Sequence, residues 1–483
     1  PPLFTADNGI LPFKHQENES NDLKKQALLP WFYSRLGPAM ASADVNGDGV
    51  EDLYLGGAQG QAGVLLLGNT AGTFSPSIQP AFNLDASCED QGAVFFDANG
   101  DGAMDLFVCS GGYDIEPNAP AIQHRLYLNN GKGMMTKATN ALPELHQPAT
   151  CVQAADADND RDLDLFVGAG VLPNQFPETG NGYLLLNDGK GKFTQGALFA
   201  GATSGLWVQT DADPEPELIT AGEWLPIQIH DNLGGSFKAT ETLHLSGLWN
   251  CLYATDMDGD GDQDVVAGNL GLNSQLRASE QEPLELYSAD FDKNGSPDPL
   301  IFYYVQGKSY PLASLEDLTG QLPYLRKKFQ YFKDYADAQV GDILTAAQIE
   351  AATHLTAQTL ESGWLENQGN GKFAFHSFPT EAQIAPVQAI ASLDANADGH
   401  MDLVLAGNRT HNRVKLGNLG GNHGQLWLNQ GNKTFRPCSY LESGLHVRGD
   451  VRSLAIVSSG TKKRLVFGIN NAAAAIYTIK SPK

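Results

Sequence analysis

Six acidic loops of nine residues recur along this chain, and they constrain its fold more than any other feature. They begin at Asp44, Asp97, Asp156, Asp256, Asp290 and Asp394. In each loop a carboxylate takes the first place, oxygen-bearing side chains take the third and fifth, and an aspartate takes the ninth. Calcium accepts about six to eight oxygen ligands in flexible geometry, whereas magnesium prefers strict octahedral sites. The pattern therefore predicts about five to six bound Ca²⁺ ions.

The acidic composition agrees with cation binding and excludes one class of partner. The chain has 56 Asp and Glu against 31 Lys and Arg, a net charge of −25. Nucleic-acid binding needs clustered basic residues, so we expect no nucleic-acid partner. No apolar run approaches the roughly 18–20 residues of a transmembrane helix. The chain opens with Pro1-Pro2, which we interpret as a mature or trimmed form.

The five cysteines leave two interpretations open. They are buried thiols, or they form up to two disulfides with one thiol left over. Cys151 and Cys251 each lie five residues before the first Asp of a loop. This equivalence favours a packing role over a redox role.

Short apolar runs flank the acidic loops. Val94–Phe96 precedes the second loop and Leu106–Val108 follows it, and such short aromatic and β-branched runs predict strands. Each acidic loop is then the turn of a hairpin. A second, Asn- and Gly-rich turn recurs, and its copies begin at Asn69, Asn129, Asn187, Asn232, Asn367 and Asn429. Asn and Gly tolerate the positive φ of tight turns, so the repeating unit is four short strands.

Units of this size predict an all-β fold, a seven-bladed β-propeller. The intervals between successive units are 45 to 59 residues. The unit at Asp211 is two residues short and has two prolines, so we expect it to have lost its metal. We interpret residues 249–380 as one elaborated blade. If Asp256 and Asp290 head separate blades, the alternative is an eight-bladed propeller.

Two segments lie outside the regular repeat. Residues 1–40 are expected to close the propeller of residues 41–483, with Phe13–Gln16 pairing beside Ala475–Thr478. Residues 311–355 are expected to be a small helical insertion within one blade, because Ser314 and Thr345 begin sequences typical of capping boxes. This insertion is either a lid for a partner or ligand, or an amphipathic helix packed on the side of the propeller.

The acidic loops and Gly-rich strands resemble the FG-GAP, or VCBS, repeats of integrin α-chain heads and bacterial surface proteins. Several stretches also resemble a bacterial branch related to cartilage acidic protein, called ASPIC/UnbV: Gly222–Pro226, Gly268–Ser274, Lys327–Phe329, Lys333–Tyr335 and Glu381–Pro386. An EF-hand is excluded because the twelfth place of the first loop is Leu55, within a strand. The resemblance implies an exported protein that is periplasmic, outer-membrane-associated or extracellular. Similar proteins are often lipoproteins, so a lipid anchor outside this chain is expected.

The resemblance also implies the calcium ligands of each loop. The side-chain ligands would be Asp44, Asn46, Asp48 and Asp52; Asp97, Asn99, Asp101 and Asp105; Asp156, Asp158, Asp160 and Asp164; Asp256, Asp258, Asp260 and Asp264; Asp290, Asp292, Asn294 and Asp298; and Asp394, Asn396, Asp398 and Asp402. The seventh place would contribute Val50, Ala103, Asp162, Asp262, Ser296 and His400, with the backbone carbonyl as the ligand. The third loop departs from the pattern, because Asn159 and Arg161 replace its glycines.

A ligand is expected at the rim of the central funnel, where the innermost strands begin. The candidate rim residues are Arg35, Glu89, Asp90, Trp207, Trp249 and Arg448. The irregular segments add Glu223, Trp224 and Asn273. Such aromatic and charged groups suit a sugar or a peptide.

Two classes of function remain. The first is a non-catalytic, calcium-stabilised module that binds a glycan, peptide or partner protein at a bacterial cell surface. The second is a polysaccharide lyase or hydrolase, for which Glu89 and Asp90 are the acid–base candidates. The sequence has no nucleophile elbow and no HExxH motif. We therefore predict a binding protein rather than an enzyme.

Overall fold

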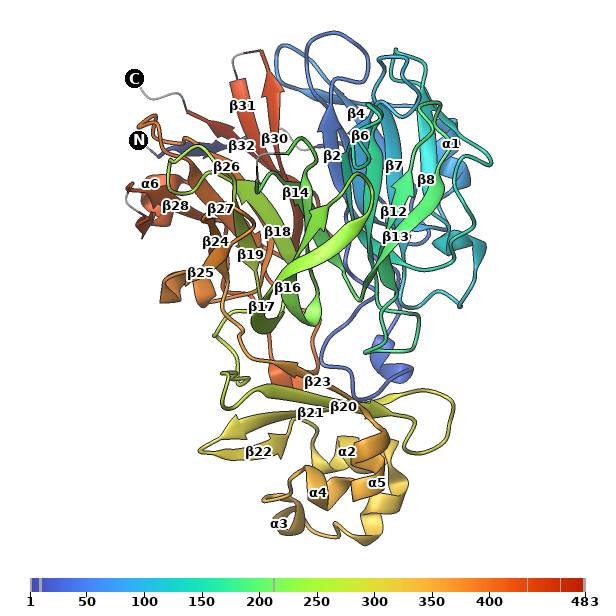
Figure 1. The fold of residues 1–483 in the computed structure, drawn as a ribbon, viewed down its shortest axis with the longest axis vertical. Coiled ribbons are helices and arrows are strands. Elements are labelled where there is room, and N and C mark those ends of the chain that lie inside the picture. The colour runs from blue at the N-terminus through green and yellow to red at the C-terminus, as the bar shows by residue number, and fades with distance from the viewer. Residues whose placement is uncertain (1, 8–10, 212, 432, 461, 481–483) are drawn as a thin grey trace.

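The computed structural model describes residues 2–7, 11–211, 213–431, 433–460 and 462–480, and antiparallel sheets dominate it (Figure 1). Its strands form eight four-stranded sheets. The prediction of an all-β protein built from four-stranded antiparallel units is confirmed at this level. No helix in the described ranges is long and apolar enough to cross a membrane.

Five sheets each use four consecutive strands. They are β2 (Met40–Ala43), β3 (Asp52–Leu55), β4 (Val64–Gly68) and β5 (Phe74–Ser77); β6 (Glu89–Phe96), β7 (Asp105–Gly111), β8 (Arg125–Asn129) and β9 (Met135–Lys137); β10 (Ala149–Ala155), β11 (Asp164–Ala169), β12 (Asn181–Leu186) and β13 (Thr194–Ala200); β14 (Ser204–Val208), β15 (Glu217–Ala221), β16 (Glu223–Asn232) and β17 (Phe237–Leu248); and β26 (Val387–Leu393), β27 (Asp402–Gly407), β28 (Gln425–Asn429) and β29 (Phe435–Pro437).

A sixth sheet is interrupted in sequence, and a seventh joins the two ends of the chain. The sixth contains β18 (Cys251–Thr255), β19 (Asp264–Gly268), β24 (Gly363–Asn367) and β25 (Phe373–Ser377). The seventh contains β30 (Val451–Ser459), β31 (Lys462–Ile469), β32 (Ala475–Ile479) and the N-terminal β1 (Phe4–Ala6). β1 pairs with β32 through residues nearer the N-terminus than the predicted Phe13–Gln16, which contributes only the bridge between Lys14 and Ala473.

The first strands of these seven sheets contact one another in chain order. β2 contacts β6, β6 contacts β10, β10 contacts β14, β14 contacts β18, β18 contacts β26 and β26 contacts β30. β30 in turn contacts β2. Each of the seven first strands therefore lies between two others.

The core lies between neighbouring sheets. Every residue of β7, β11 and β27 is buried. Phe107 of β7 and Leu165 of β11 belong to one apolar cluster, although they are in different sheets. A strand covered on both faces is apolar along its whole length rather than at alternate residues, which explains the short continuous apolar runs after the loops.

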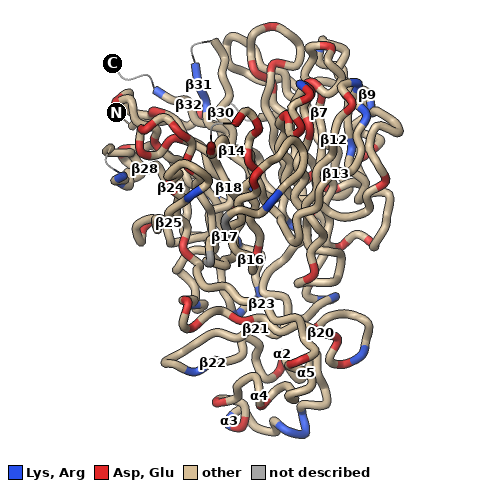
Figure 2. The backbone as a smooth tube through the Cα atoms, in the orientation of Figure 1, with Lys and Arg blue, Asp and Glu red and all other residues tan. Residues whose placement is uncertain are grey.

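The interruption between β19 and β24 forms the eighth sheet and a group of short helices, which project at one end of the molecule (Figure 1). The sheet contains β20 (Leu284–Ala289), β21 (Asp298–Val305), β22 (Lys308–Pro311) and β23 (Thr353–Ala357). The helices are α2 (Leu315–Gln321), the 3₁₀ helix η3 (Pro323–Lys327), α3 (Phe332–Tyr335), α4 (Val340–Ile343) and α5 (Ala346–Ala351). Residues 315–351 thus fold as several short helices rather than one amphipathic helix, whereas the two ends of the predicted range 311–355 belong to the strands β22 and β23. Figure 2 shows Lys and Arg at the far end of this inserted segment.

Few helices lie outside the insertion. They are α1 (Pro80–Leu84), α6 (Tyr440–Ser443) and the 3₁₀ helices η1 (Asp22–Lys24), η2 (Pro120–Ile122), η4 (Thr380–Gln383) and η5 (Val414–Leu416). All of them are short connections between strands or sheets.

Candidate metal loops and a central cavity

The aspartate that closes each acidic loop is buried and held by backbone N–H groups. In the second loop, Asp105 accepts hydrogen bonds from the backbone of Ala98 at 3.0 Å and of Asn129 at 2.7 Å, one on each carboxylate oxygen. Burial raises the pKa of Asp105 to about 6. The other five closing residues, Asp52, Asp164, Asp264, Asp298 and Asp402, accept the same hydrogen bond from the second residue of their loops. The ninth residue therefore organises its hairpin as well as offering oxygen atoms.

The opening aspartate orders the exposed part of the loop. Asp44 accepts hydrogen bonds from the backbone of Gly47 at 2.8 Å and of Gly49 at 2.8 Å. Both glycines have positive φ, at 75° and 79°. In the third loop Asn159 and Arg161 adopt the same conformation, with φ of 62° and 78°. That loop keeps the shared backbone despite lacking glycine, although positive φ is costly for arginine.

The oxygen atoms of several loops gather closely enough to hold a cation. Carboxylate oxygens lie within 4.8 Å of one another in three loops: Asp156, Asp158 and Asp164; Asp256, Asp258 and Asp260; and Asp290, Asp292 and Asp298. Buried oxygens without a hydrogen-bond partner occur on Asp158, Asp162 and Asp262. Such orphaned oxygens suit an oxygen-ligated ion such as calcium. The sites fit the predicted metal, and which of the predicted residues ligate it stays a prediction.

The shortened loop at Asp211 also gathers carboxylates. Asp211, Asp213, Glu217 and Asp231 offer oxygens within 4.8 Å of one another. Glu217 is buried in the closing position and accepts hydrogen bonds from the backbone and hydroxyl of Thr210 at 2.7 and 2.8 Å. The loss of two residues has therefore not dispersed the acidic groups of this loop.

Asparagines of the second turn connect four of the acidic loops to the next sheet. Asn129 donates its side-chain N–H to the Val45 carbonyl of the preceding loop at 2.7 Å. Asn187 donates to the Ala98 carbonyl at 2.9 Å in the same way. The sequence indicated these asparagines only as turn residues. Their recurrence at the end of the third strand is the signal that points to this link between sheets.

A central cavity of about 290 Å³ lies among the first strands of the seven contacting sheets. Four polar residues in its lining occupy β-bulges, where the first strand has one extra residue relative to the second: Gln91, Thr150, Gln388 and Arg452. Bulges bend a strand and re-aim the side chain of the extra residue. The bulges therefore contribute to a polar wall at this level of the cavity.

Two buried arginines line the cavity. Arg452 contacts Asp450 at 3.4 Å through one nitrogen. Arg409 lies over the Trp31 ring at 4.4 Å, contacts Glu223 at 3.4 Å and donates to Asn250 at 3.1 Å. Sequence reasoning did not identify either arginine.

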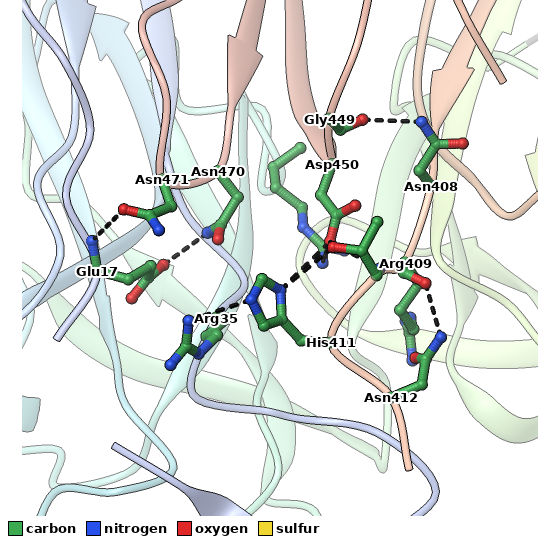
Figure 3. Close-up of polar contacts among 12 residues, drawn as sticks. Glu17, Arg35, Asn408, Arg409, His411, Asn412, Gly449, Asp450, Asn470 and Asn471 are labelled. Carbon is green, nitrogen blue, oxygen red and sulfur yellow. Dashed lines mark hydrogen bonds and ion pairs between the residues drawn. The ribbon is translucent and has the colours of Figure 1, made fainter. Parts of the chain in front are cut away.

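Asp450 connects the cavity to a polar network at its edge. Figure 3 shows His411 between Arg35 and Asp450, with the His411 ring 3.2 Å from an Arg35 nitrogen and 3.7 Å from an Asp450 oxygen. Burial would raise the pKa of Asp450, but the contact with His411, the charge of Arg452 and the hydrogen bonds from Thr410 lower it to about 2. Asp450 is therefore a permanent anion beside Arg452.

The structure separates the residues predicted to bind a ligand at the rim and on the irregular segments. Glu223 and Trp249 line the cavity. Trp224 is buried in the core, and Trp207 packs against Phe237 at a ring distance of 6.0 Å. The side chains of Asn273 and Arg448 are exposed and are not part of the cavity lining.

The two acidic candidates for acid–base chemistry have different surroundings. Asp90 is 2.5 Å from Arg125 and accepts hydrogen bonds from Tyr54 at 2.8 Å and the Gly57 backbone at 2.9 Å. Glu89 is fully buried, and burial raises its pKa well above the ordinary value. Asp90 thus forms a buried ion pair with Arg125, which sequence reasoning did not identify.

All five cysteines lie in the described ranges as free thiols. The Cys151 thiol lies 3.7 Å from the Gly205 carbonyl, and the Cys251 thiol lies 3.8 Å from the Val387 carbonyl. Each contact joins the first strands of neighbouring sheets, which agrees with the packing role expected from their equivalent positions.

Comparisons with known proteins identify the repeat in one part of the chain. Residues 44–108, which include the first two acidic loops, match the model of the FG-GAP-like repeat. No curated protein sequence matches the chain. Among solved structures, the V. cholerae biofilm matrix protein Bap1 is similar at 10% identity and a TM-score of 0.41, over 99% of this chain and 92% of that one. BBS1N in complex with ARL6DN is similar at 9% identity and a TM-score of 0.46, over 100% of this chain and 98% of that one. The chain therefore contains an FG-GAP-like repeat, whereas its place in the ASPIC/UnbV branch stays a prediction.

Proposed function

We propose that this chain is a calcium-stabilised, seven-bladed β-propeller that acts as a non-catalytic binding module at a bacterial cell surface. The observation that carries the proposal is the hydrogen bond shared by the six acidic loops, in which the closing aspartate accepts the N–H of the second loop residue. The same hydrogen bond in every loop gives the six loops the same backbone arrangement around their clustered oxygens, as a repeated calcium site requires.

The contacts between first strands support seven blades. β30 contacts both β26 and β2, and the N-terminal β1 completes the last sheet. Under this proposal the β20–β23 sheet is an insertion beside the propeller, because none of its strands is a first strand in that series. The Asp290 loop then holds a calcium ion outside the blades.

The proposed location and partner follow from the sequence resemblance. The protein is exported and works in the periplasm, on the outer membrane or outside the cell, where calcium is available to weak sites. Its partner is a glycan, a peptide or another protein. Catalysis gains no support from Asp90, because Arg125, Tyr54 and Gly57 already bind its carboxylate.

Calcium dependence is the direct test of the metal sites. Thermal unfolding should be measured in calcium, in magnesium and in EDTA at constant ionic strength. We expect calcium to raise the melting temperature strongly and magnesium to raise it less, because an ion that binds only the folded state stabilises that state. An identical melting temperature in calcium and EDTA would contradict the proposal.

Binding should be tested on the calcium-loaded protein with a glycan array and with pull-downs from cell envelopes, each repeated in EDTA. Reproducible, saturable binding to one glycan or one envelope protein is the expected result. Release of oligosaccharides from a polysaccharide during these incubations would instead indicate the lyase or hydrolase alternative.

A further inference from the structure

The residues that line the central cavity carry several buried side-chain atoms without a hydrogen-bond partner, and these atoms are all nitrogens. In the described part of the chain they are Nε and Nη1 of Arg452, Nε of Arg409, Nε1 of Trp249, Nδ2 of Asn250 and Nε2 of Gln388. The Asn250 amide is oriented by Arg409, which donates to its oxygen at 3.1 Å. Buried polar groups normally have hydrogen-bond partners, so a wall with only unpaired donors is complementary to hydrogen-bond acceptors.

The charge of the cavity favours an anionic acceptor. Its lining contains two arginines and one carboxylate, Glu223. Glu223 is already engaged, because Tyr33 donates to one of its oxygens at 2.6 Å and Arg409 contacts the other at 3.4 Å. Burial lowers the pKa of Arg452 to about 10, so the guanidinium stays protonated at neutral pH, and Asp450 contacts one of its nitrogens at 3.4 Å. Two of its three nitrogens remain free to bind a ligand.

We infer that the central cavity binds a small ligand through an oxyanion group, a carboxylate or a sulfate, which accepts hydrogen bonds from Arg452 and the neighbouring donors. Guanidinium groups bind such oxyanions through charge-assisted hydrogen bonds. This inference rests on the proposed binding role, to which it adds the site and the chemical class of the ligand.

The size of the cavity limits the ligand. Its volume of about 290 Å³ is near the lower end of the range for small-molecule sites, which is about 300–1,000 Å³. The site therefore suits a single acidic sugar ring or a molecule of similar size rather than a long chain. The uncharged N–H groups of Asn250 and Gln388 would donate hydrogen bonds to hydroxyl or carbonyl oxygens of such a ligand.

The test is isothermal titration of the whole chain in excess calcium with three probes: sodium glucuronate, sodium sulfate and glucose. Sodium chloride keeps the ionic strength constant in every titration. Glucuronate and glucose share a ring and differ in the carboxylate, so their comparison isolates the oxyanion. Sulfate distinguishes a general oxyanion site from one that requires a carboxylate on a sugar.

Matched variants locate the binding. Arg452→Met removes the cavity guanidinium, whereas Arg448→Met makes the same change at an exposed arginine near the start of the same strand. Gln388→Leu removes one uncharged donor and leaves all charges in place, so it remains informative if Arg452→Met does not fold.

We expect saturable binding of glucuronate, sulfate or both, and no binding of glucose at the same concentrations. Affinity should fall at least about tenfold in Arg452→Met, as expected for the loss of a charge-assisted hydrogen bond, and should fall measurably in Gln388→Leu. Arg448→Met should bind like the wild type.

Three results would overturn the inference: neither anion binds, glucose binds as well as glucuronate, or the cavity variants bind as the wild type does. The first, combined with strong stabilisation by calcium, would refute only the cavity site. Anion binding without any effect of EDTA on stability would instead refute the calcium part of the proposed function.

Discussion

Two aspartates of one loop should contribute differently to stability in the absence of calcium, because one is buried and the other exposed. Asp105 closes the second loop with 0% exposure and accepts backbone hydrogen bonds at 3.0 and 2.7 Å. Asp101 is exposed and accepts one hydrogen bond, from the Ala103 backbone at 2.8 Å. The variants Asp105→Asn and Asp101→Ala therefore separate the structural role of the loop from its metal-binding role.

The magnitudes follow from these contacts. Asp105→Asn places an amide N–H₂ against one buried N–H donor, and a buried polar group left unsatisfied costs about 1–3 kcal/mol even without metal. Asp101→Ala exposes a backbone N–H to water, so in EDTA it should cost no more than about 0.5 kcal/mol. With calcium at about 100 times its Kd, loss of the ion removes a further ~2.7 kcal/mol from either variant.

Urea unfolding of both variants and of the wild type, in EDTA and in saturating calcium, measures these free energies. We expect Asp105→Asn to be destabilised in both conditions and Asp101→Ala only in calcium. Equal stability of the two variants in EDTA would refute the reasoning from buried hydrogen bonds. A loss for Asp101→Ala that is the same in EDTA and calcium would refute its assignment as a metal ligand.

Three further predictions concern buried groups. Arg125→Met should lower the free energy of unfolding by about 3–5 kcal/mol, because it leaves the charge of Asp90 buried without its partner, and adding Asp90→Asn should restore part of the loss in urea unfolding. Burial raises the pKa of Glu17 from its ordinary 4.5 to about 7, so the stability it contributes is complete below pH 4.5 and is lost as the pH rises to 7. Compared with the wild type, Glu17→Gln should therefore melt with a flatter dependence on pH in this range, and an unchanged profile would contradict the assignment. Because all five cysteines are free thiols, reductant should leave the melting temperature unchanged, whereas a decrease would reveal a disulfide.

Much of the architecture could be predicted because each hairpin carries its own local signal. The acidic loops and the turns that begin with Asn129 or Asn187 do lie between neighbouring strands of one sheet. The inserted segment was harder to predict. Its Asp290 loop resembles the others in sequence, yet the β20–β21 hairpin that contains it belongs to a separate sheet. Loop chemistry specifies a hairpin but not the sheet against which that hairpin packs.

The N-terminal strand β1 illustrates the same limit. Phe4–Ala6 is only three residues long, and its pairing with β32 is a contact between the two ends of the chain. A segment this short has no periodicity from which its partner could be read. The fully buried second strands, in contrast, were recognisable because burial on both faces requires continuous apolar residues.

The sequence by itself determined the repeating hairpins and the acidic loops, because both depend on residues close together in the chain. The central cavity was decided by tertiary structure alone. Four polar residues line the cavity from β-bulges of four different sheets: Gln91, Thr150, Gln388 and Arg452. No local sequence pattern predicts these bulges. Only the packing of the sheets around a common centre brings these donors together and removes them from water. Burial of the Gln388 and Arg452 nitrogens without partners is therefore a property of the assembled fold, and it is what makes the cavity a candidate ligand site.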